Sequence, residues 1–292
     1  MTADPNAVQV EDIFQGPVFA GLVKNYLYSN LALVGASPYV VDDPSVQWSG
    51  GGDTVTIPKF NGKITMVDLP RDGSCPDAQR VTMGSDTATV VGKYAGIQIP
   101  TSQLEDAYRD GRINWEFFGA IAENVGEAAL DAVDQILIAK AEATTLTPVT
   151  CAVGGVPTYD DVMDARGRWG DKLNIPSMLV LHSTPYIAAA KSSDVKTFST
   201  SNMDVMRTGS LPGLAGVPVA VSDNIGNDGS YYKNILIRRG GIRYSMKRTL
   251  TYKKVPIPGD QDLHEFTFRM VAWLDKANTL PGTVLIKSAY AA

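Results

Sequence analysis

One uninterrupted helical pattern, between residues 114 and 143, constrains the fold of this chain more than any other feature. Apolar or small residues recur there at spacings of three and four, which places them on one face of an α-helix. These residues are Trp115, Phe118, Ala122, Val125, Ala129, Ala132, Ile136 and Ala143. At about 1.5 Å per residue the helix would be about 45 Å long. One small core needs less than that, so the pattern predicts a strut against which other elements lie.

The opposite face of this predicted helix is acidic. It carries Glu116, Glu123, Glu127, Asp131 and Asp134, and Lys140 is the only base in the stretch. Like charges four residues apart weaken an isolated helix by about 0.2–0.5 kcal/mol per pair. Either water covers this face, or a basic segment does.

A segment of the required charge lies between residues 233 and 254, which hold eight bases and no acid. Ile242, Tyr244 and Met246 alternate with polar or basic residues there, which predicts a strand with one basic face. The bases have three possible partners: acidic protein surface, water and nucleic acid. We expect the first, with the acidic face meeting the basic strand within one subunit or across an interface. The residues in this expected contact are Glu123, Glu127, Asp131, Arg243, Lys247 and Arg248.

The segments before the long helix have little apolar core of their own. Residues 1–49 form an arm, with a short helix predicted between 18 and 33. Residues 50–98 read as two threonine-rich extended segments on either side of a polar tip that contains Arg71 and Asp72. This pattern predicts a long β-hairpin. Isolated hairpins are marginally stable in water, so it is either a surface meander or an arm that lies on another subunit, with Arg71 and Asp72 at the interface.

After the long helix, short helices alternate with strands from residue 156 to residue 242, which predicts a compact α/β unit. Thr158 is a suitable N-cap for a helix that runs to Trp169. Strands are predicted at 177–181, 217–222 and 234–238, and a helix begins at Ser183. The basic strand should pair back with 264–273 as a hairpin, and 283–287 is the last strand.

Composition and motifs exclude several functional classes. With 292 residues, 44% of them hydrophobic and 20% charged, the chain should fold as one large or two small domains. A net charge of −5 gives no whole-chain case for binding nucleic acid. The first residues lack a signal peptide, and no apolar run approaches the roughly 18 residues that cross a membrane.

Residues suited to catalysis are sparse. His182 and His264 have no Cys or His at metal-ligand spacing, and no phosphate-binding or nucleophile motif occurs. Cys75 and Cys151 are far apart in sequence, so free thiols are expected, with an intersubunit disulfide as the alternative. We therefore expect no active site, no cofactor and no metal ion.

The order of these parts resembles the major capsid proteins of tailed bacteriophages, which have the Hong Kong 97-like fold. The most specific local match is GSLPGLAGVPVAVSDNI, residues 209–225, which is similar to a family segment leading through Gly-x-Pro to a short strand and a polar turn. The resemblance implies an α+β fold with an N-terminal arm, an extended hairpin called the E-loop, a spine helix, a peripheral domain and an α/β axial domain. The implied divisions are 1–49 for the arm, 50–98 for the E-loop, 99–155 with 243–278 for the peripheral domain and spine helix, and 156–242 with 279–292 for the axial domain.

The resemblance also implies a function. The chain would be a structural protein, not an enzyme, that forms pentamers and hexamers of an icosahedral shell enclosing phage double-stranded DNA. Its implied partners are further copies of itself, a separate scaffolding protein and a portal, with weak non-specific contact to packaged DNA and none to a membrane. Whether a decoration protein binds as well stays open. The implied location is the virion capsid, after assembly in the host cytoplasm.

Two other functions stay open at this point. An encapsulin-like nanocompartment shares the fold but holds protein cargo. A small α/β hydrolase or transferase would need a pocket with paired titratable groups, and the sequence indicates no residues for one.

Overall fold

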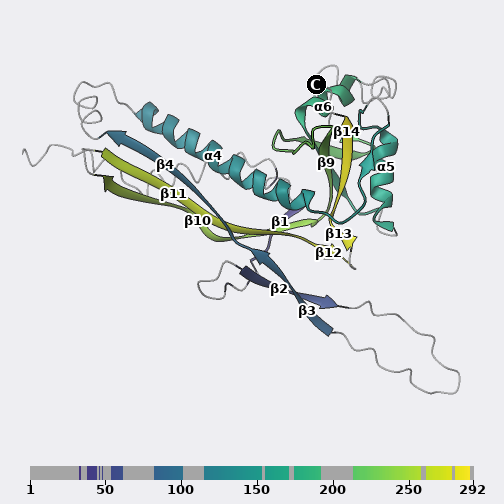
Figure 1. Cartoon of the computed structure of the whole chain (residues 1–292), viewed down its shortest axis with the longest axis horizontal. Helices are drawn as coiled ribbons and strands as arrows, with labels where there is room; N and C mark the ends of the chain where they lie inside the picture. The colour runs from purple at the N-terminus through teal and green to yellow at the C-terminus, as the bar shows by residue number, and fades with distance from the viewer. Residues whose placement is uncertain are drawn as a thin grey trace, which may run out of the picture.

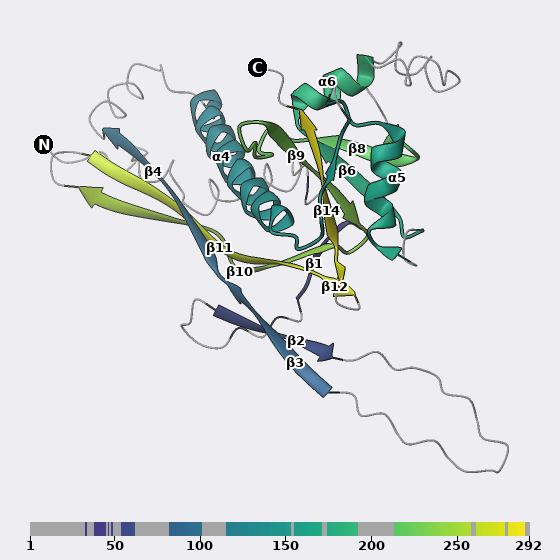
Figure 2. The same ribbon diagram turned by 45° about the vertical axis from the view of Figure 1, so that its right-hand side comes forward.

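The computed structural model describes residues 33, 38–44, 46, 48, 54–61, 82–100, 115–152, 155–170, 174–191, 213–257, 261–277 and 280–289. One long helix, α4, lies along a four-stranded sheet, and a second sheet with two short helices stands at one end of α4 (Figure 1). A two-stranded hairpin leaves the four-stranded sheet on the side away from α4, as both ribbon views show (Figure 2).

Helix α4 spans Trp115–Glu142, which confirms the helix predicted from periodicity. Its 28 residues correspond to about 42 Å. Val125, Ala129, Val133 and Ile136 form its buried face, as the three-and-four spacing requires. Leu137 is fully buried in the core that α4 shares with strands of both sheets. The helix is therefore the strut that the sequence predicts.

The four-stranded sheet has the order β1-β10-β11-β4. Its strands are β1 (Val40–Asp42), β10 (Ile242–Ile257), β11 (Gln261–Leu274) and β4 (Val91–Pro100). The long strands β10 and β11 pair antiparallel, which confirms the predicted hairpin. Strand β1 comes from the N-terminal region and pairs parallel with β10. One face of this sheet packs against α4 through residues such as Phe266, Phe268 and Met270.

The second sheet has six strands in the order β5-β14-β9-β6-β8-β7. Their bounds are Val149–Thr150, Thr283–Ala289, Tyr231–Arg238, Ser177–Leu181, Val217–Val221 and Gly213–Leu214. Helices α5 (Tyr159–Gly167) and α6 (Ser183–Lys191) accompany it. Thr158 and Asp161 form a capping box at the start of α5, as expected for a threonine N-cap. A further pair of very short strands, β12 (Lys276–Ala277) and β13 (Leu280–Pro281), follows β11.

The hairpin consists of β2 (Thr54–Asn61) and β3 (Thr82–Thr89), which pair antiparallel along their whole length. The sequence places the hairpin at 50–98, but residues 91–98 belong to β4, which pairs with β11. An alternating pattern identifies a strand without identifying its partner, so this assignment needs the tertiary structure. The tip with Arg71 and Asp72 lies outside the described residues, and so does the helix predicted between 18 and 33, apart from Leu33.

The two sheets meet at a tightly packed junction. A Cβ atom on Gly282 would lie 2.2 Å from the Cα atom of Gly241, so neither backbone tolerates a side chain there. Arg238, at the end of β9, is only 2% exposed. Its Nη2 atom donates to the carbonyl oxygens of Asp275 and Leu280, at 3.2 and 3.3 Å. This member of the basic run therefore connects β9 to the segment that follows β11, a role that the sequence does not indicate.

Candidate assembly surfaces

The three acidic residues expected at an interface lie on the outer side of α4. Glu123, Glu127 and Asp131 are all exposed. Asp131 also makes contacts inside the subunit. Its Oδ1 atom accepts a hydrogen bond from Asn224 at 2.6 Å, and its Oδ2 atom accepts one from Gln135 at 2.8 Å. Asp131 thus attaches α4 to the turn after β8.

The three bases expected to meet them have separate environments. Arg243 pairs with Asp43 at 3.0 Å and with Asp275 at 3.3 Å, so it connects the start of β10 to two other segments of the same subunit. The Lys247 ammonium lies 5.8 Å from the centre of the Trp48 ring, within the range of a cation–π contact. Arg248 is exposed.

One ion pair does join the acidic helix to the basic run, but through other residues. Lys233 Nζ lies 3.6 Å from Glu142 Oε2, near the end of α4. The other carboxylate oxygen of Glu142 accepts the backbone N–H of Gly226 at 2.9 Å. A partly exposed pair of this kind contributes only about 0.2–1 kcal/mol. It therefore orients the end of α4 against β9 more than it stabilises the fold.

Asp134 is not on the solvated acidic face that the helical pattern predicts. Burial is the main reason that its pKa is raised to about 6, a hydrogen bond from the backbone of Leu33 opposes this shift, and the charge of Asp131 adds to it. Its Oδ1 atom is buried and has no hydrogen-bond partner. Leu33 is itself buried in the core beside α4. Leu33, which contacts Asp134, lies about 100 residues earlier in the chain, and helical spacing carries no information about such a contact.

The middle of β10 departs from regular strand pairing. The register with β11 shifts between Met246 and Arg248, and again between Arg248 and Thr251. Each shift leaves one extra residue on β10, as in a β-bulge. Bulges redirect the side chains of the strand that carries them. Arg248 consequently lies opposite Arg269 on β11, and Arg269 lies opposite Gly92 on β4. The strict alternation predicted for this strand ends at the first shift.

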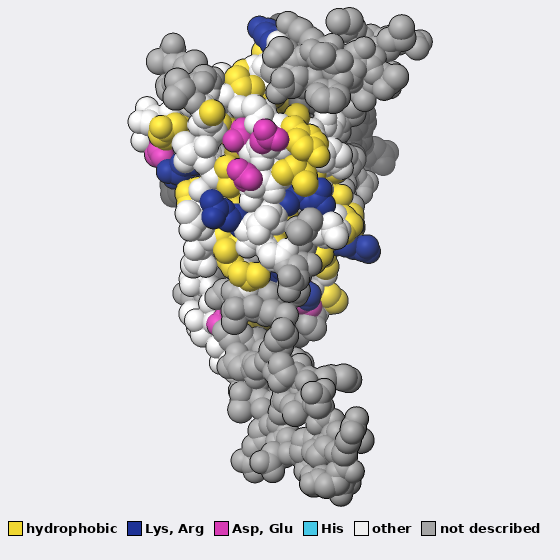
Figure 3. Space-filling model, turned by 90° about the vertical axis from the view of Figure 1, so that its right-hand side faces the viewer, with side chains coloured by type: hydrophobic (Ala, Val, Ile, Leu, Met, Phe, Trp, Pro, Cys, Tyr) yellow, Lys and Arg dark blue, Asp and Glu magenta, His cyan; other side chains and the backbone are white. Residues whose placement is uncertain are grey.

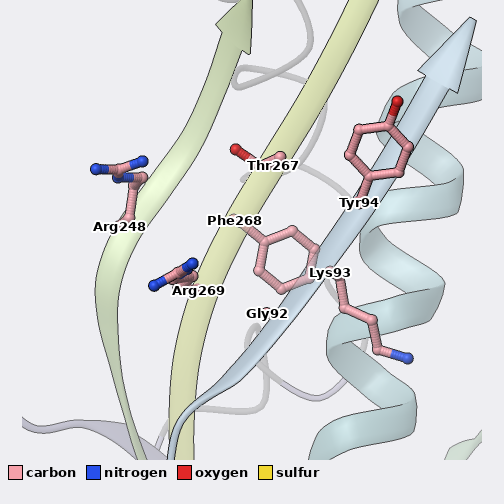
Figure 4. Close-up of a pocket in the computed structure, with 7 residues that line it drawn as sticks. All are labelled: Gly92, Lys93, Tyr94, Arg248, Thr267, Phe268 and Arg269. Atoms are coloured by element: carbon pink, nitrogen blue, oxygen red, sulfur yellow. The ribbon is translucent and has the colours of Figure 1, made fainter. Parts of the chain in front are cut away.

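An open cavity of about 350 Å³ lies at this irregularity. It is lined by Gly92, Lys93, Tyr94, Arg248, Thr267, Phe268 and Arg269 (Figure 4). The close-up shows the two arginines on neighbouring strands, with Tyr94 on the next strand. Among the described residues, neither guanidinium has an ion-pair or hydrogen-bond partner. Sequence analysis singled out Arg248 but not Arg269 or Tyr94, because cross-strand register brings them together.

The end of the molecule that carries the six-stranded sheet presents a mixed surface. Figure 3 shows hydrophobic side chains there between acidic and basic ones. Two large hydrophobic residues are about half exposed, Tyr159 on α5 at 54% and Ile187 on α6 at 50%. Hydrophobic residues scattered among charges are typical of a soluble surface or of a modest polar contact rather than of one large apolar interface.

The histidines have structural contacts. The Nδ1 atom of His182 accepts the backbone N–H of Thr184 at 3.2 Å, at the start of α6, and its ring stacks on Tyr232 at 4.2 Å. The Ser183 hydroxyl lies 3.4 Å from the same Nδ1 atom. It also hydrogen-bonds to Asp223, which is the main cause of the lowered pKa of that carboxyl. His264 is buried, and its Nδ1 atom lies 2.7 Å from the Tyr252 hydroxyl.

Other reactive groups show no catalytic arrangement in the part of the chain that the structure describes. Burial, followed by the charge of Asp161, raises the pKa of the Cys151 thiol to about 12, so this thiol is a poor nucleophile at neutral pH. No group of three potential metal ligands occurs within the described ranges. No described helix has the length and apolar character needed to span a membrane.

Comparison with known proteins gives two different results. No model of a protein family and no curated protein sequence matches this chain. Solved structures do match. The capsid of a native GTA particle matches with a TM-score of 0.62 and 13% identity, over 89% of this chain and 90% of that one. The capsid of cyanophage P-SCSP1u matches with a TM-score of 0.61 and 9% identity, over 87% of each chain. The chain has the major capsid protein fold of tailed phages.

A third match has the widest coverage of these three. A virus-like particle from Pyrococcus furiosus matches with a TM-score of 0.59 and 13% identity, over 92% of this chain and 98% of that one. At such identities the likeness establishes the fold alone. It confirms the mixed helix-and-strand architecture inferred from the order of parts, whereas the division into domains at particular residues stays a prediction.

Proposed function

We propose that this chain is a structural major capsid protein, which assembles into an icosahedral shell around the double-stranded DNA of a tailed phage. The observation that carries the proposal is the extent of the shared capsid fold, which covers 89% of this chain in the GTA capsid and 87% in the cyanophage capsid. Such a protein would be found in the virion after assembly in the host cytoplasm. Its further partners would be a scaffolding protein and a portal.

The hairpin supports assembly on physical grounds. Among the hairpin residues whose burial is described, 54–57 and 84–89, the buried hydrophobic ones are Val55 and Ala88, so this part of the hairpin has little core of its own. A two-stranded hairpin of this kind is marginally stable in water. It would gain stability by lying on a neighbouring copy. Contacts of this type run from one part of a subunit to a different part of the next, and they close into rings such as pentamers and hexamers.

We propose the following division of labour within the subunit. Residues 1–49 are an arm, 50–98 are mainly the exchanged hairpin, 99–155 with 243–278 form the peripheral domain, and 156–242 with 279–292 form the axial domain. The contacts between copies would involve the hairpin tip, with Arg71 and Asp72, and the exposed residues Glu123, Glu127 and Arg248. Asp131, Arg243 and Lys247 have contacts inside the subunit, which makes them weaker candidates.

A protein nanocompartment is the second candidate. It is favoured by the match that covers 92% of this chain and 98% of a virus-like particle protein. Both candidates are shells, and both differ from the small α/β enzyme that the sequence alone leaves open. The enzyme is disfavoured because the Nδ1 atom of His182 already accepts a backbone hydrogen bond and the Cys151 thiol is buried.

The test is to express the full chain and examine it by electron microscopy. Closed shells with uniform diameter support both shell proposals, and a stable monomer under all conditions refutes them. Nuclease treatment of the particles, followed by extraction of their contents, then distinguishes the capsid from the nanocompartment. Protected double-stranded DNA in particles from infected or induced cells supports the capsid, and a co-purifying protein cargo in place of DNA supports the nanocompartment.

A further inference from the structure

We propose that Arg248 and Arg269 form a carboxylate-binding site that receives an acidic side chain from a second copy of this chain. The site lies on the face of the four-stranded sheet that is turned away from α4. The inference rests on the proposed function, because it requires copies of the chain to lie side by side in a shell.

The first argument is that the two arginines lie at opposite positions on neighbouring strands, without an acidic partner among the described residues. They occupy directly opposite positions on β10 and β11, where like charges destabilise a sheet. Both side chains are exposed, and no acidic partner for either occurs among the described residues. The register shifts on either side of Arg248 create this juxtaposition, and bulges are features that proteins retain to direct side chains. An anion between the two guanidinium groups would turn a repulsive pair into an attractive cluster.

The second argument is the shape of the site. Gly92 lies beside Arg269 on β4, and a Cβ atom there would reach contact distance of the arginine, 3.6 Å from Cγ and 3.8 Å from Nε. Because Gly92 has no Cβ atom, the cavity of about 350 Å³ stays open at this position. Tyr94 is 59% exposed, but its hydroxyl lies over Gly96 and therefore points along β4, away from Arg269. Both arginine side chains are exposed, and Figure 4 shows them on neighbouring strands of the sheet.

The third argument concerns the kind of anion. Arginine binds a carboxylate through two parallel hydrogen bonds, so a pair of arginines suits one or two acidic side chains. The chain has 31 acidic and 26 basic residues, so every neighbouring copy offers carboxylates in excess. This excess of carboxylates on every neighbouring copy favours a protein carboxylate as the anion.

The hairpin is the part of a second copy that is best placed to supply the carboxylate. It leaves the sheet on the side away from α4 (Figures 1 and 2). Arg269 lies on that side too, because it alternates along β11 with Phe268 and Met270, which pack in the core with α4. In a shell one subunit thick, the same side of every copy faces the same way. A neighbour's hairpin therefore remains on the side of the arginines, whereas a neighbour's Glu127 on α4 does not. The sequence of the hairpin tip between Lys63 and Arg80 contains three carboxylates, Asp68, Asp72 and Asp77, and one base, Arg71.

The experiment measures the protein concentration at which the full-length chain forms shells at low salt. Arg269→Glu and Arg248→Glu should each raise this concentration at least about tenfold, and Arg168→Glu, at an exposed arginine after α5, should leave it within about twofold. Combining Arg269→Glu with Asp72→Arg should recover shells in part. Combining Arg269→Glu with Glu127→Lys distinguishes the hairpin from α4 as the source of the carboxylate. Recovery of shells in this double variant would assign the contact to α4 of the second copy.

Three outcomes would overturn the inference. The first is normal shell formation with both arginines reversed. The second is that neither carboxylate reversal restores assembly. The third is that Arg269→Glu particles assemble but lose their nuclease-protected DNA, which would assign the site to phosphate. If Arg269→Glu fails to fold by circular dichroism, Arg269→Gln removes the charge and leaves a shorter polar side chain, and it should raise the assembly concentration by a smaller factor. Failure of the wild-type chain to form shells would refute the proposed function instead, so the two failures are distinguishable.

Discussion

Removing the charge of Asp134 should stabilise the protein at neutral and alkaline pH. The folded structure raises the pKa of this carboxyl from 3.8 to about 6, chiefly by burial. The folded protein therefore binds a proton that the unfolded chain has lost between about pH 4 and pH 6, and stability decreases as the pH rises through this window. Above it, the folded state carries the full cost of a partly buried, incompletely solvated carboxylate.

The size of this cost follows from the change in the pKa of Asp134. Raising this pKa from 3.8 to about 6 corresponds to an upper limit of about 3 kcal/mol, at about 1.4 kcal/mol for each pH unit. Because the side chain is only partly buried, solvent screening reduces this to about 1–2 kcal/mol. Asp134→Asn keeps an oxygen that can accept the hydrogen bond from the backbone of Leu33 while it removes the charge. The variant should therefore be more stable than the wild type by about 1–2 kcal/mol at pH 8 and equally stable at pH 4.

The assay is urea unfolding of the unassembled full-length chain at pH 4, 5, 6, 7 and 8, with the free energy of unfolding compared between variant and wild type at each pH. Asp164→Asn, at an exposed carboxylate on α5, is the matched control and should show a difference near zero throughout. A difference for Asp134→Asn that does not change with pH would mean that the carboxylate charge is not its source. A loss of stability at pH 8 would refute the reasoning directly.

Three further predictions concern the hairpin, the junction and the core. Deletion of residues 69–77 should leave a folded subunit with a cooperative thermal transition but impair closed shells in electron micrographs, because the hairpin has too little core to stabilise the monomer; loss of the cooperative transition would count against this. Gly282→Ala should lower the free energy of unfolding by about 3 kcal/mol or more, because its Cβ atom would lie 2.2 Å from the Cα atom of Gly241, whereas Gly167→Ala meets no atom within 4 Å and should cost little. Leu137→Ala should cost about 2–5 kcal/mol in urea unfolding, since this leucine is fully buried between α4 and both sheets, and a cost below 1 kcal/mol would show that the core can collapse around the gap.

The sequence by itself determines the elements whose signals are local. Helix α4 follows from the spacing of contiguous apolar residues, and its bounds differ from the predicted ones by one residue at each end. The capping box of α5 depends only on Thr158 and the residue three positions later. The β10–β11 hairpin needs two alternating segments and a short loop. Since each pattern is contained in one stretch of chain, the physical preference that it reports is present before any tertiary contact forms.

Tertiary structure alone decides which residues share a surface. Asp134 and Glu127 are both acids on the same helix, yet the contact of Leu33 makes only Asp134 partly buried. Arg238 and Arg248 belong to one basic run, but the first is buried in the junction between the sheets and the second is exposed beside Arg269. The physical reason is that burial and cross-strand register depend on partners tens to hundreds of residues away. Periodicity and composition describe neighbours along the chain, whereas the environment of a charge is set by its neighbours in space.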